Sequence, residues 1–222
     1  MTFVLVHGAW HSPWYWREVT PHLNAPAVAV DLPSCGPPHG DMHDDARAIR
    51  DVLDAHTDVT LVAHSYGGMP ATEAAAGHPA VRHLVYVAAY NADENETLMT
   101  FAAMAGTEPN INPQVDCDFE DGLLVFKPDR AEHVLFHDCP DPREAASHLR
   151  PMAPPFAQQS PNAVAWKTIP STYVICTEDR ATAVGVQRTL GTRATHVHDL
   201  PSSHSAFLSH PTRLAEIINT AH

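Results

Sequence analysis

Short runs of apolar, β-branched residues alternate along this chain with longer segments in which apolar residues repeat at helical spacing. Such runs are typical of strands that are buried on both faces of a parallel sheet. The predicted strands cover residues 2–6, 27–31, 59–64, 84–89, 171–176 and 195–200. The predicted helices cover residues 13–23, 42–55, 67–77, 183–190 and 205–220. The alternation predicts an α/β fold, with a mostly parallel sheet and helices on both of its faces.

The alternation stops between about residues 91 and 165, where proline and acidic residues are frequent. We expect residues 1–90 and 166–222 to form the α/β core and residues 91–165 to form a small inserted cap above the sheet. A disordered linker is the alternative, but large apolar residues such as Phe101 and Phe136 argue against it. Within the cap, residues 122–126 and 132–136 are expected to pair as a hairpin, and residues 142–149 to be helical.

A serine stands between small residues where the third predicted strand ends, in the run Ala-His-Ser-Tyr-Gly-Gly that contains Ser65. Ala63 and Gly67, two positions before and after it, permit the sharp strand-to-helix turn of a nucleophile elbow. That turn exposes the hydroxyl and aims backbone N–H groups and the positive end of a helix dipole toward it. A five-residue pattern also arises by chance, but the strand before it and the helix after it favour Ser65 as a nucleophile.

A His-Gly turn follows the first predicted strand. Gly8 is expected to let the backbone approach a substrate, and the N–H of Ala9 is expected to join that of Tyr66 in holding an oxyanion. An ordinary glycine turn is the alternative, and the serine elbow makes it the weaker one. Trp10 is a candidate for the wall of a substrate pocket, because aromatic side chains commonly line such sites.

Two further candidates follow late strands. Asp179 comes directly after the strand 171–176, and the carboxyl ends of parallel strands are where such sheets bind ligands. Its neighbour Glu178 is the alternative acid. Seventeen histidines make any single one suspect, but His204 stands in a loop just before the last predicted helix, where its ring can reach the serine.

These motifs together resemble the α/β-hydrolases, and specifically their small-cap group of plant hydroxynitrile lyases, methyl-ester-cleaving esterases and bacterial esterase-like proteins. The segments that carry the resemblance are 3–10, 31–33, 63–68, 86–90, 176–180 and 203–205. The chain order of α/β-hydrolases is serine, acid, histidine, which Ser65, Asp179 and His204 keep. The group places its acid eight residues before a glutamine, and Gln187 keeps that distance from Asp179. Its oxyanion donors resemble Ala9 and Tyr66.

The resemblance implies a serine hydrolase that cleaves a small carboxylic ester through an acyl-enzyme. Two alternatives stay open. The lyases of the group cleave a carbon–carbon bond, but they carry threonine at the position of Gly8 and lysine after the catalytic histidine, where this chain has Ser205. A binding protein that retains the pocket without catalysis is the second alternative.

The composition limits the classes of molecule that we expect this protein to bind. The formal charge is −13, from 13 Lys and Arg against 26 Asp and Glu, which argues against nucleic acid and anionic membranes. No apolar stretch reaches the length of a membrane span and no leader precedes the first strand, so a cytoplasmic location is expected. No metal, phosphate or dinucleotide motif occurs, so no metal or other cofactor is expected. The four cysteines are expected to be free, with a Cys117–Cys139 bridge left open, as is the oligomeric state.

Overall fold

Six parallel strands form the central sheet in the computed structural model, which describes residues 1–37 and 39–221 and, at residues 155 and 156, the backbone only. The strands are β1 (Thr2–Val6), β2 (Ala27–Val30), β3 (Val59–His64), β4 (Val81–Val87), β7 (Ser171–Cys176) and β8 (His196–Leu200). Their order is β2-β1-β3-β4-β7-β8, and every neighbouring pair is parallel. The predicted α/β architecture is confirmed.

The strand order reverses at the centre of the sheet. The chain passes from β1 to β2 on one side and then returns to place β3 on the other side of β1. The segments that leave β1 and β3 therefore diverge, and this topological switch point opens a crevice beyond the carboxyl ends of the strands. Every residue of β3 is buried, as its apolar sequence predicts.

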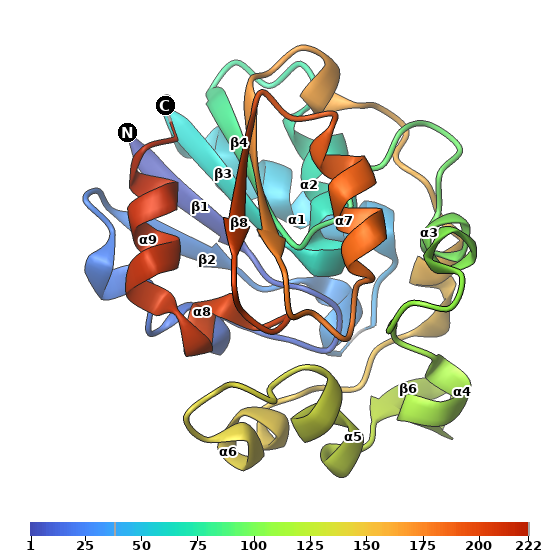
Figure 1. Cartoon of the computed structure of the whole chain (residues 1–222). Helices are drawn as coiled ribbons and strands as arrows, with labels where there is room; N and C mark the ends of the chain where they lie inside the picture. Colours follow the sequence, from blue (N-terminus) through green and yellow to red (C-terminus); the bar gives the residue numbers. More distant parts are fainter. Residues whose placement is uncertain (38, 222) are drawn as a thin grey trace.

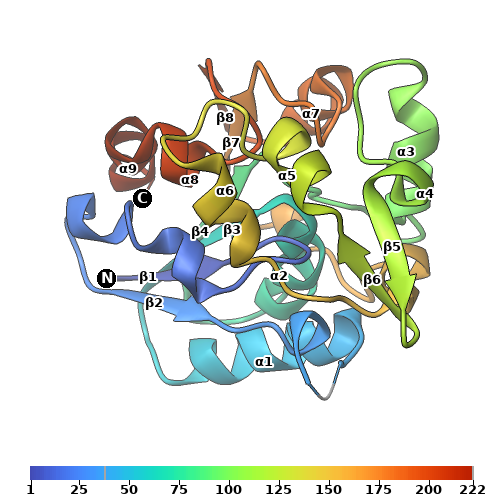
Figure 2. The same cartoon turned by 90° about the horizontal axis from the view of Figure 1, so that it is seen from below.

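Helices cover both faces of the sheet. The core helices are α1 (Met42–Asp54), α2 (Gly68–Ala75), α7 (Val184–Gly191), α8 (Ala206–Ser209) and α9 (Pro211–Asn219). Helices α1 and α2 pack together on one face, whereas α8 and α9 lie on the other (Figures 1 and 2). Asp41 caps α1 by accepting from the backbone N–H groups of His43 and Asp44.

Two predicted helices are interrupted. The segment 13–23 forms two 3₁₀ turns, η1 (Pro13–Trp16) and η2 (Thr20–His22), rather than one helix. The segment 205–220 is divided between α8 and α9. Pro211 explains this division, because a proline has no N–H with which to continue a helix and is tolerated at the first position of a new one.

The inserted segment between β4 and β7 lies next to the carboxyl ends of the strands, below and to the right of the sheet in Figure 1, with α5 and α6 in front of the sheet in Figure 2. It contains α3 (Leu98–Ala105), α4 (Pro113–Asp116), β5 (Cys117–Glu120), β6 (Leu123–Phe126), α5 (Pro128–Val134) and α6 (Pro142–Ser147). The side chains of Phe101 and Phe136 are buried, so the segment packs as structure rather than as a loose linker.

The predicted hairpin partner is wrong. Strand β6 pairs antiparallel with β5, which precedes it, and residues 132–136 are not a strand. Asp121 and Gly122 both have positive φ, of 49° and 85°, as a tight hairpin turn requires. Pro128 starts helix α5, so the chain after β6 turns into a helix instead.

The four cysteines are buried and free, and Cys117 and Cys139 form no disulfide bridge. Among the described residues, no helix combines the length and the apolar character that crossing a bilayer demands.

Candidate active site

Ser65 occupies a strained turn between β3 and α2. Its φ is 53°, in the left-handed region that residues other than glycine seldom adopt, and the residue is 6% exposed. The backbone N–H of Tyr90, three residues after the end of β4, donates to the Ser65 carbonyl at 3.1 Å and so supports the turn. A side chain at Gly67 would place its Cβ only 2.3 Å from the His7 carbonyl oxygen. The turn therefore has the form of the nucleophile elbow that the sequence predicts.

Asp179 and His204 meet beyond the ends of β7 and β8. His204 Nδ1 lies 2.7 Å from Asp179 Oδ2, and both residues are buried. The carboxylate also accepts from the backbone N–H groups of Ala181 and Thr182 and from Gln187 Nε2 at 2.8 Å. Because the carboxylate is an acceptor, His204 donates through Nδ1, and its Nε2 is left to accept a proton.

Glu178 does not compete for this histidine. Its described contacts are made by the backbone, where the N–H donates to the Ser202 carbonyl and the carbonyl accepts from His137 Nε2. Gln187 stands in α7 and also accepts from the Cys176 N–H, so it holds Asp179 against the end of β7. The spacing that favoured Asp179 thus corresponds to a direct contact in the structure.

The loop with His204 is tied to the residue before the serine. His64 Nε2 donates to the His204 carbonyl at 2.9 Å, and the two rings lie 4.5 Å apart. Among the described residues, no hydrogen bond joins the Ser65 hydroxyl to His204. Such bonds are often long without substrate and tighten only when it binds. Burial lowers the pKa of His64, which keeps this neighbouring ring neutral.

The turn after β1 lies against the elbow. A Cβ at Gly8 would stand 2.8 Å from His64 Nδ1 and 2.9 Å from Ser65 Cβ. The space beside Gly8 is therefore filled by the elbow itself, whereas the sequence suggested that it opens toward a substrate. What the missing side chain permits is close contact between the two turns. The Gly8 carbonyl accepts from His7 Nδ1 at 2.9 Å and from the His11 N–H at 3.2 Å.

A small cavity of about 100 Å³ opens at Ser65. The core residues that line it are Ala9, Trp10, Ser65, Tyr66 and Tyr90. The inserted segment contributes Leu98, Met99, Ala102, Asn110, Ile111, Pro113 and Ala157. None of these side chains carries a charge, and most are apolar. The structure thus brings the predicted serine, both predicted oxyanion residues and Trp10 to one cavity, with Gly8 directly behind it.

Sequence reasoning missed a buried carboxylate behind Tyr66. Asp45 Oδ2 accepts from the Tyr66 hydroxyl and from Ser34 Oγ, each at 2.6 Å, and Oδ1 accepts from the Ser34 N–H. Desolvation raises the pKa of Asp45 to about 6. Asp45 stands in the first turn of α1, where acidic residues are common because they interact favourably with the helix dipole. The sequence around it therefore does not mark it as part of a site.

The sequence is similar to those of known proteins. Residues 3–217 match the Alpha/beta hydrolase family. The chain belongs to that family. A curated relative, the Alpha/beta hydrolase nvfD of Aspergillus novofumigatus, is 29% identical over 98% of this chain and 95% of its own length. Methylesterase 9 of Arabidopsis thaliana is 26% identical over 84% of this chain and 83% of its own.

The fold agrees with those of a solved hydrolase and a solved esterase. The crystal structure of the pyrethroid hydrolase PytH superposes with a TM-score of 0.83, at 27% identity, over 99% of this chain and 96% of that one. The structure of polyneuridine aldehyde esterase gives a TM-score of 0.84 at 22% identity, over 98% and 97% of the two chains. The resemblance to the methyl esterase-like group is confirmed.

Proposed function

We propose that this protein is a serine hydrolase that cleaves a small, uncharged carboxylic ester. The observation that carries the proposal is the buried Asp179–His204 pair, 2.7 Å apart. The backbone of His204 is hydrogen-bonded to His64, which directly precedes a serine whose φ of 53° marks a nucleophile elbow. The apolar lining of the cavity supports an uncharged substrate. Names of relatives such as Methylesterase 9 and the pyrethroid hydrolase support an ester as the bond that is cleaved.

The proposed reaction begins when the Ser65 hydroxyl attacks the ester carbonyl carbon. His204 Nε2 takes the hydroxyl proton, while Asp179 keeps Nδ1 protonated and stabilises the imidazolium. The tetrahedral intermediate collapses as the same proton passes to the leaving alcohol. Water then attacks the acyl-enzyme by the same route and releases the carboxylic acid and the free serine.

The backbone N–H groups of Ala9 and Tyr66 are the proposed donors to the oxyanion of each intermediate. Both residues line the cavity with Ser65. Loss of one such donor reduces transition-state stabilisation by about 3 kcal/mol in a well-studied protease. The lyase alternative has less support, because Ser205, which follows the histidine, is buried and offers no ammonium group to a departing cyanide.

The decisive experiment replaces the nucleophile. Ser65→Ala should lower the rate of p-nitrophenyl acetate hydrolysis by about 10⁴- to 10⁶-fold, because the Ser65 hydroxyl is the only nucleophile of the proposed acylation step. Ser147→Ala, at an exposed position near the end of α6, is the matched control and should keep the wild-type rate. A fluorophosphonate should label the Ser65 peptide, as read by mass spectrometry.

Retained turnover in a folded Ser65→Ala protein would contradict the nucleophile assignment. Cyanide release from mandelonitrile by the wild-type protein, without ester cleavage, would instead favour the lyase. Ester binding without turnover of any kind would favour the binding protein.

A further inference from the structure

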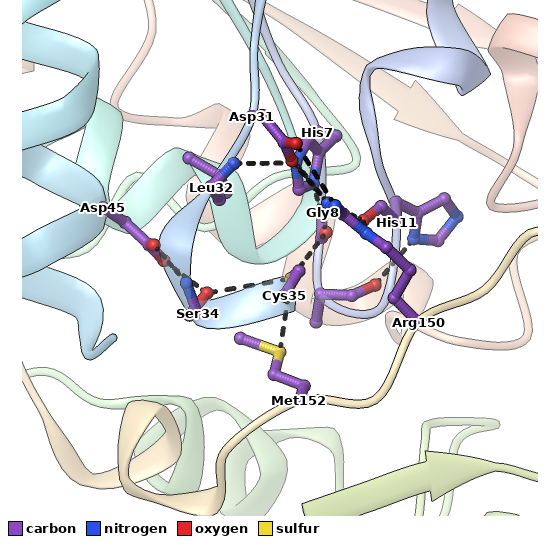
Figure 3. A network of polar contacts seen from close by, with 11 residues as sticks. His7, Gly8, His11, Asp31, Leu32, Ser34, Cys35, Asp45, Arg150 and Met152 are labelled. Carbon is purple, nitrogen blue, oxygen red and sulfur yellow. Dashed lines mark hydrogen bonds and ion pairs between the residues drawn. The ribbon is translucent and has the colours of Figure 1, made fainter. Parts of the chain in front are cut away.

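Arg150 connects the inserted segment to the turn that carries Ala9. It stands after α6, and its guanidinium lies between Asp31, at the end of β2, and the turn that follows β1 (Figure 3). Nη2 donates to Asp31 Oδ1 at 2.6 Å, and both Nε and Nη2 donate to the His11 carbonyl, at 3.1 and 2.9 Å. The backbone N–H of Arg150 donates to the Trp10 carbonyl at 2.7 Å. One residue thus holds two successive carbonyls of the turn.

These contacts reach the proposed oxyanion donor through two hydrogen bonds in series. Arg150 fixes the carbonyls on both sides of His11, and the Trp10 carbonyl shares one planar peptide with the His11 N–H. The His11 N–H in turn donates to the Gly8 carbonyl. The Gly8 carbonyl and the Ala9 N–H belong to the same planar trans peptide, so they point in opposite directions. Whatever fixes the Gly8 carbonyl therefore also fixes the direction of the Ala9 N–H.

The backbone of this turn needs outside support. Trp10 has a φ of 61°, which is strained for a side chain of its size. Such a conformation persists only where surrounding contacts over-determine it. The Trp10 carbonyl is held by Arg150, and its indole N–H donates to the Leu124 carbonyl in β6. Both contacts come from the inserted segment.

His7 completes the support from the core side. The Leu32 N–H donates to His7 Nε2 at 3.1 Å, which leaves the proton on Nδ1, where it meets the Gly8 carbonyl. Burial lowers the pKa of His7 and keeps this neutral form. The Arg150–Asp31 pair lies beside His7 Nε2, and the Arg150 side chain is 28% exposed. A partly exposed ion pair of this kind contributes little stability, so its main effect is on geometry.

We infer that Arg150 is a positioning residue: it braces the turn after β1 from the inserted segment and so aims the Ala9 N–H at the oxyanion. This inference rests on the proposed function. It makes the inserted segment a part of the catalytic apparatus as well as a wall of the cavity. Loss of Arg150 should weaken binding of the transition state and leave ground-state ester binding nearly unchanged.

The test compares Arg150→Gln, Arg150→Lys and the control Arg143→Gln, which removes an exposed arginine from α6. Arg150→Gln should lower kcat for p-nitrophenyl acetate about 10- to 100-fold with KM within about twofold. Arg150→Lys should fall between, because an ammonium can pair with Asp31 but lacks the fork that also reaches the His11 carbonyl. Arg143→Gln should match the wild type.

A second measurement separates positioning from general loosening of the fold. A trifluoromethyl ketone, whose adduct with a serine bears an oxyanion, should bind Arg150→Gln weaker by the same factor by which kcat/KM falls. The melting temperature should stay close to that of Arg143→Gln. Should Arg150→Gln prove unstable, Arg150→Lys carries the same comparison.

The outcomes are distinguishable. If the wild type hydrolyses the ester, Ser65→Ala does not, and both Arg150 variants retain wild-type kcat, the inference is wrong and the proposed function stands. A rise in KM alone, or a loss of activity that only follows a loss of folded protein, also overturns it. If the wild type hydrolyses no ester, the proposed function fails and the inference fails with it.

Discussion

Asp45 shows how a single buried residue can shape the site from behind. Its carboxylate accepts the Tyr66 hydroxyl on one side and Ser34 on the other, so it fixes the side chain of the residue whose amide follows the nucleophile. The pKa of about 6 lies above the ordinary value of 3.8, because burial penalises the charged form more than the hydrogen bonds favour it. At neutral pH the fold therefore contains a buried negative charge.

The titration of Asp45 predicts a pH-dependent stability. Because its folded pKa is raised, the stability it contributes is fully present below about pH 4 and is lost as pH rises through about 6. The difference between the two pKa values corresponds to roughly 3 kcal/mol. The free energy of unfolding of wild type relative to Asp45→Asn should fall by up to that amount between pH 4 and pH 7, measured by urea denaturation.

Asp51→Asn, at an exposed position of the same helix, serves as the control and should give a nearly constant difference. Parallel curves for wild type and Asp45→Asn would show that Asp45 does not titrate in this range.

At the scale of elements, the sequence pattern was sufficient to predict those strands and turns whose structure depends mainly on their own residues. Apolar runs predicted the six core strands, and the small residues around Ser65 predicted the elbow. The hairpin of the inserted segment was misassigned although its turn signal, Asp121-Gly122, stands in the sequence. The apolar run at residues 132–136 resembles a strand, but its first three residues belong to helix α5, which Pro128 starts.

Contacts between distant segments could not be predicted in this way. Arg150 and Asp31 are 119 residues apart, and no sequence motif predicts that they form an ion pair. The pairing of Asp179 with His204 was accessible only because both follow parallel strands and so reach the same edge of the sheet. Long-range polar contacts without such a rule become visible only in the folded structure.

The close packing at the junction of β3 and α2 predicts that Gly67 does not tolerate a side chain. In Gly67→Ala the new Cβ would lie 2.3 Å from the His7 carbonyl oxygen, which is backbone and has little freedom to move. Overpacking of this kind costs about 1–3 kcal/mol, occasionally more, and here it also displaces the β1 turn. Unfolding free energy and esterase activity should therefore both fall.

Gly191→Ala is the matched control, because its Cβ would meet only side-chain atoms at 3.7 Å at the end of α7. That variant should be neutral or slightly stabilising, since alanine favours helix more than glycine. Equal effects at the two positions would contradict the close packing of the elbow on the β1 turn.

At the scale of the whole molecule, three buried histidines near the carboxyl ends of the strands must stay neutral. His7, His11 and His64 are all buried next to the site, and burial lowers the pKa of each. His11 is the clearest case, with a pKa lowered to about 3. Its Nδ1 donates to the Ala9 carbonyl at 2.6 Å, while its ring packs among Tyr15, Phe136 and Phe207.

These histidines predict that acid destabilises the fold, with a sign opposite to that of Asp45. A histidine whose folded pKa is depressed binds fewer protons in the folded chain than in the unfolded chain, so stability is lost as pH falls below about 6.5. His11 alone should contribute a loss of roughly 2 kcal/mol between pH 7 and pH 5. Urea denaturation at the two pH values should show this loss in the wild type and a correspondingly smaller one in His11→Gln.

The control His196→Gln, at an exposed position of β8, should keep the wild-type difference. If His11→Gln lost as much stability in acid as the wild type, His11 would have to be protonated within the folded protein, and the aromatic packing around it would have to admit water.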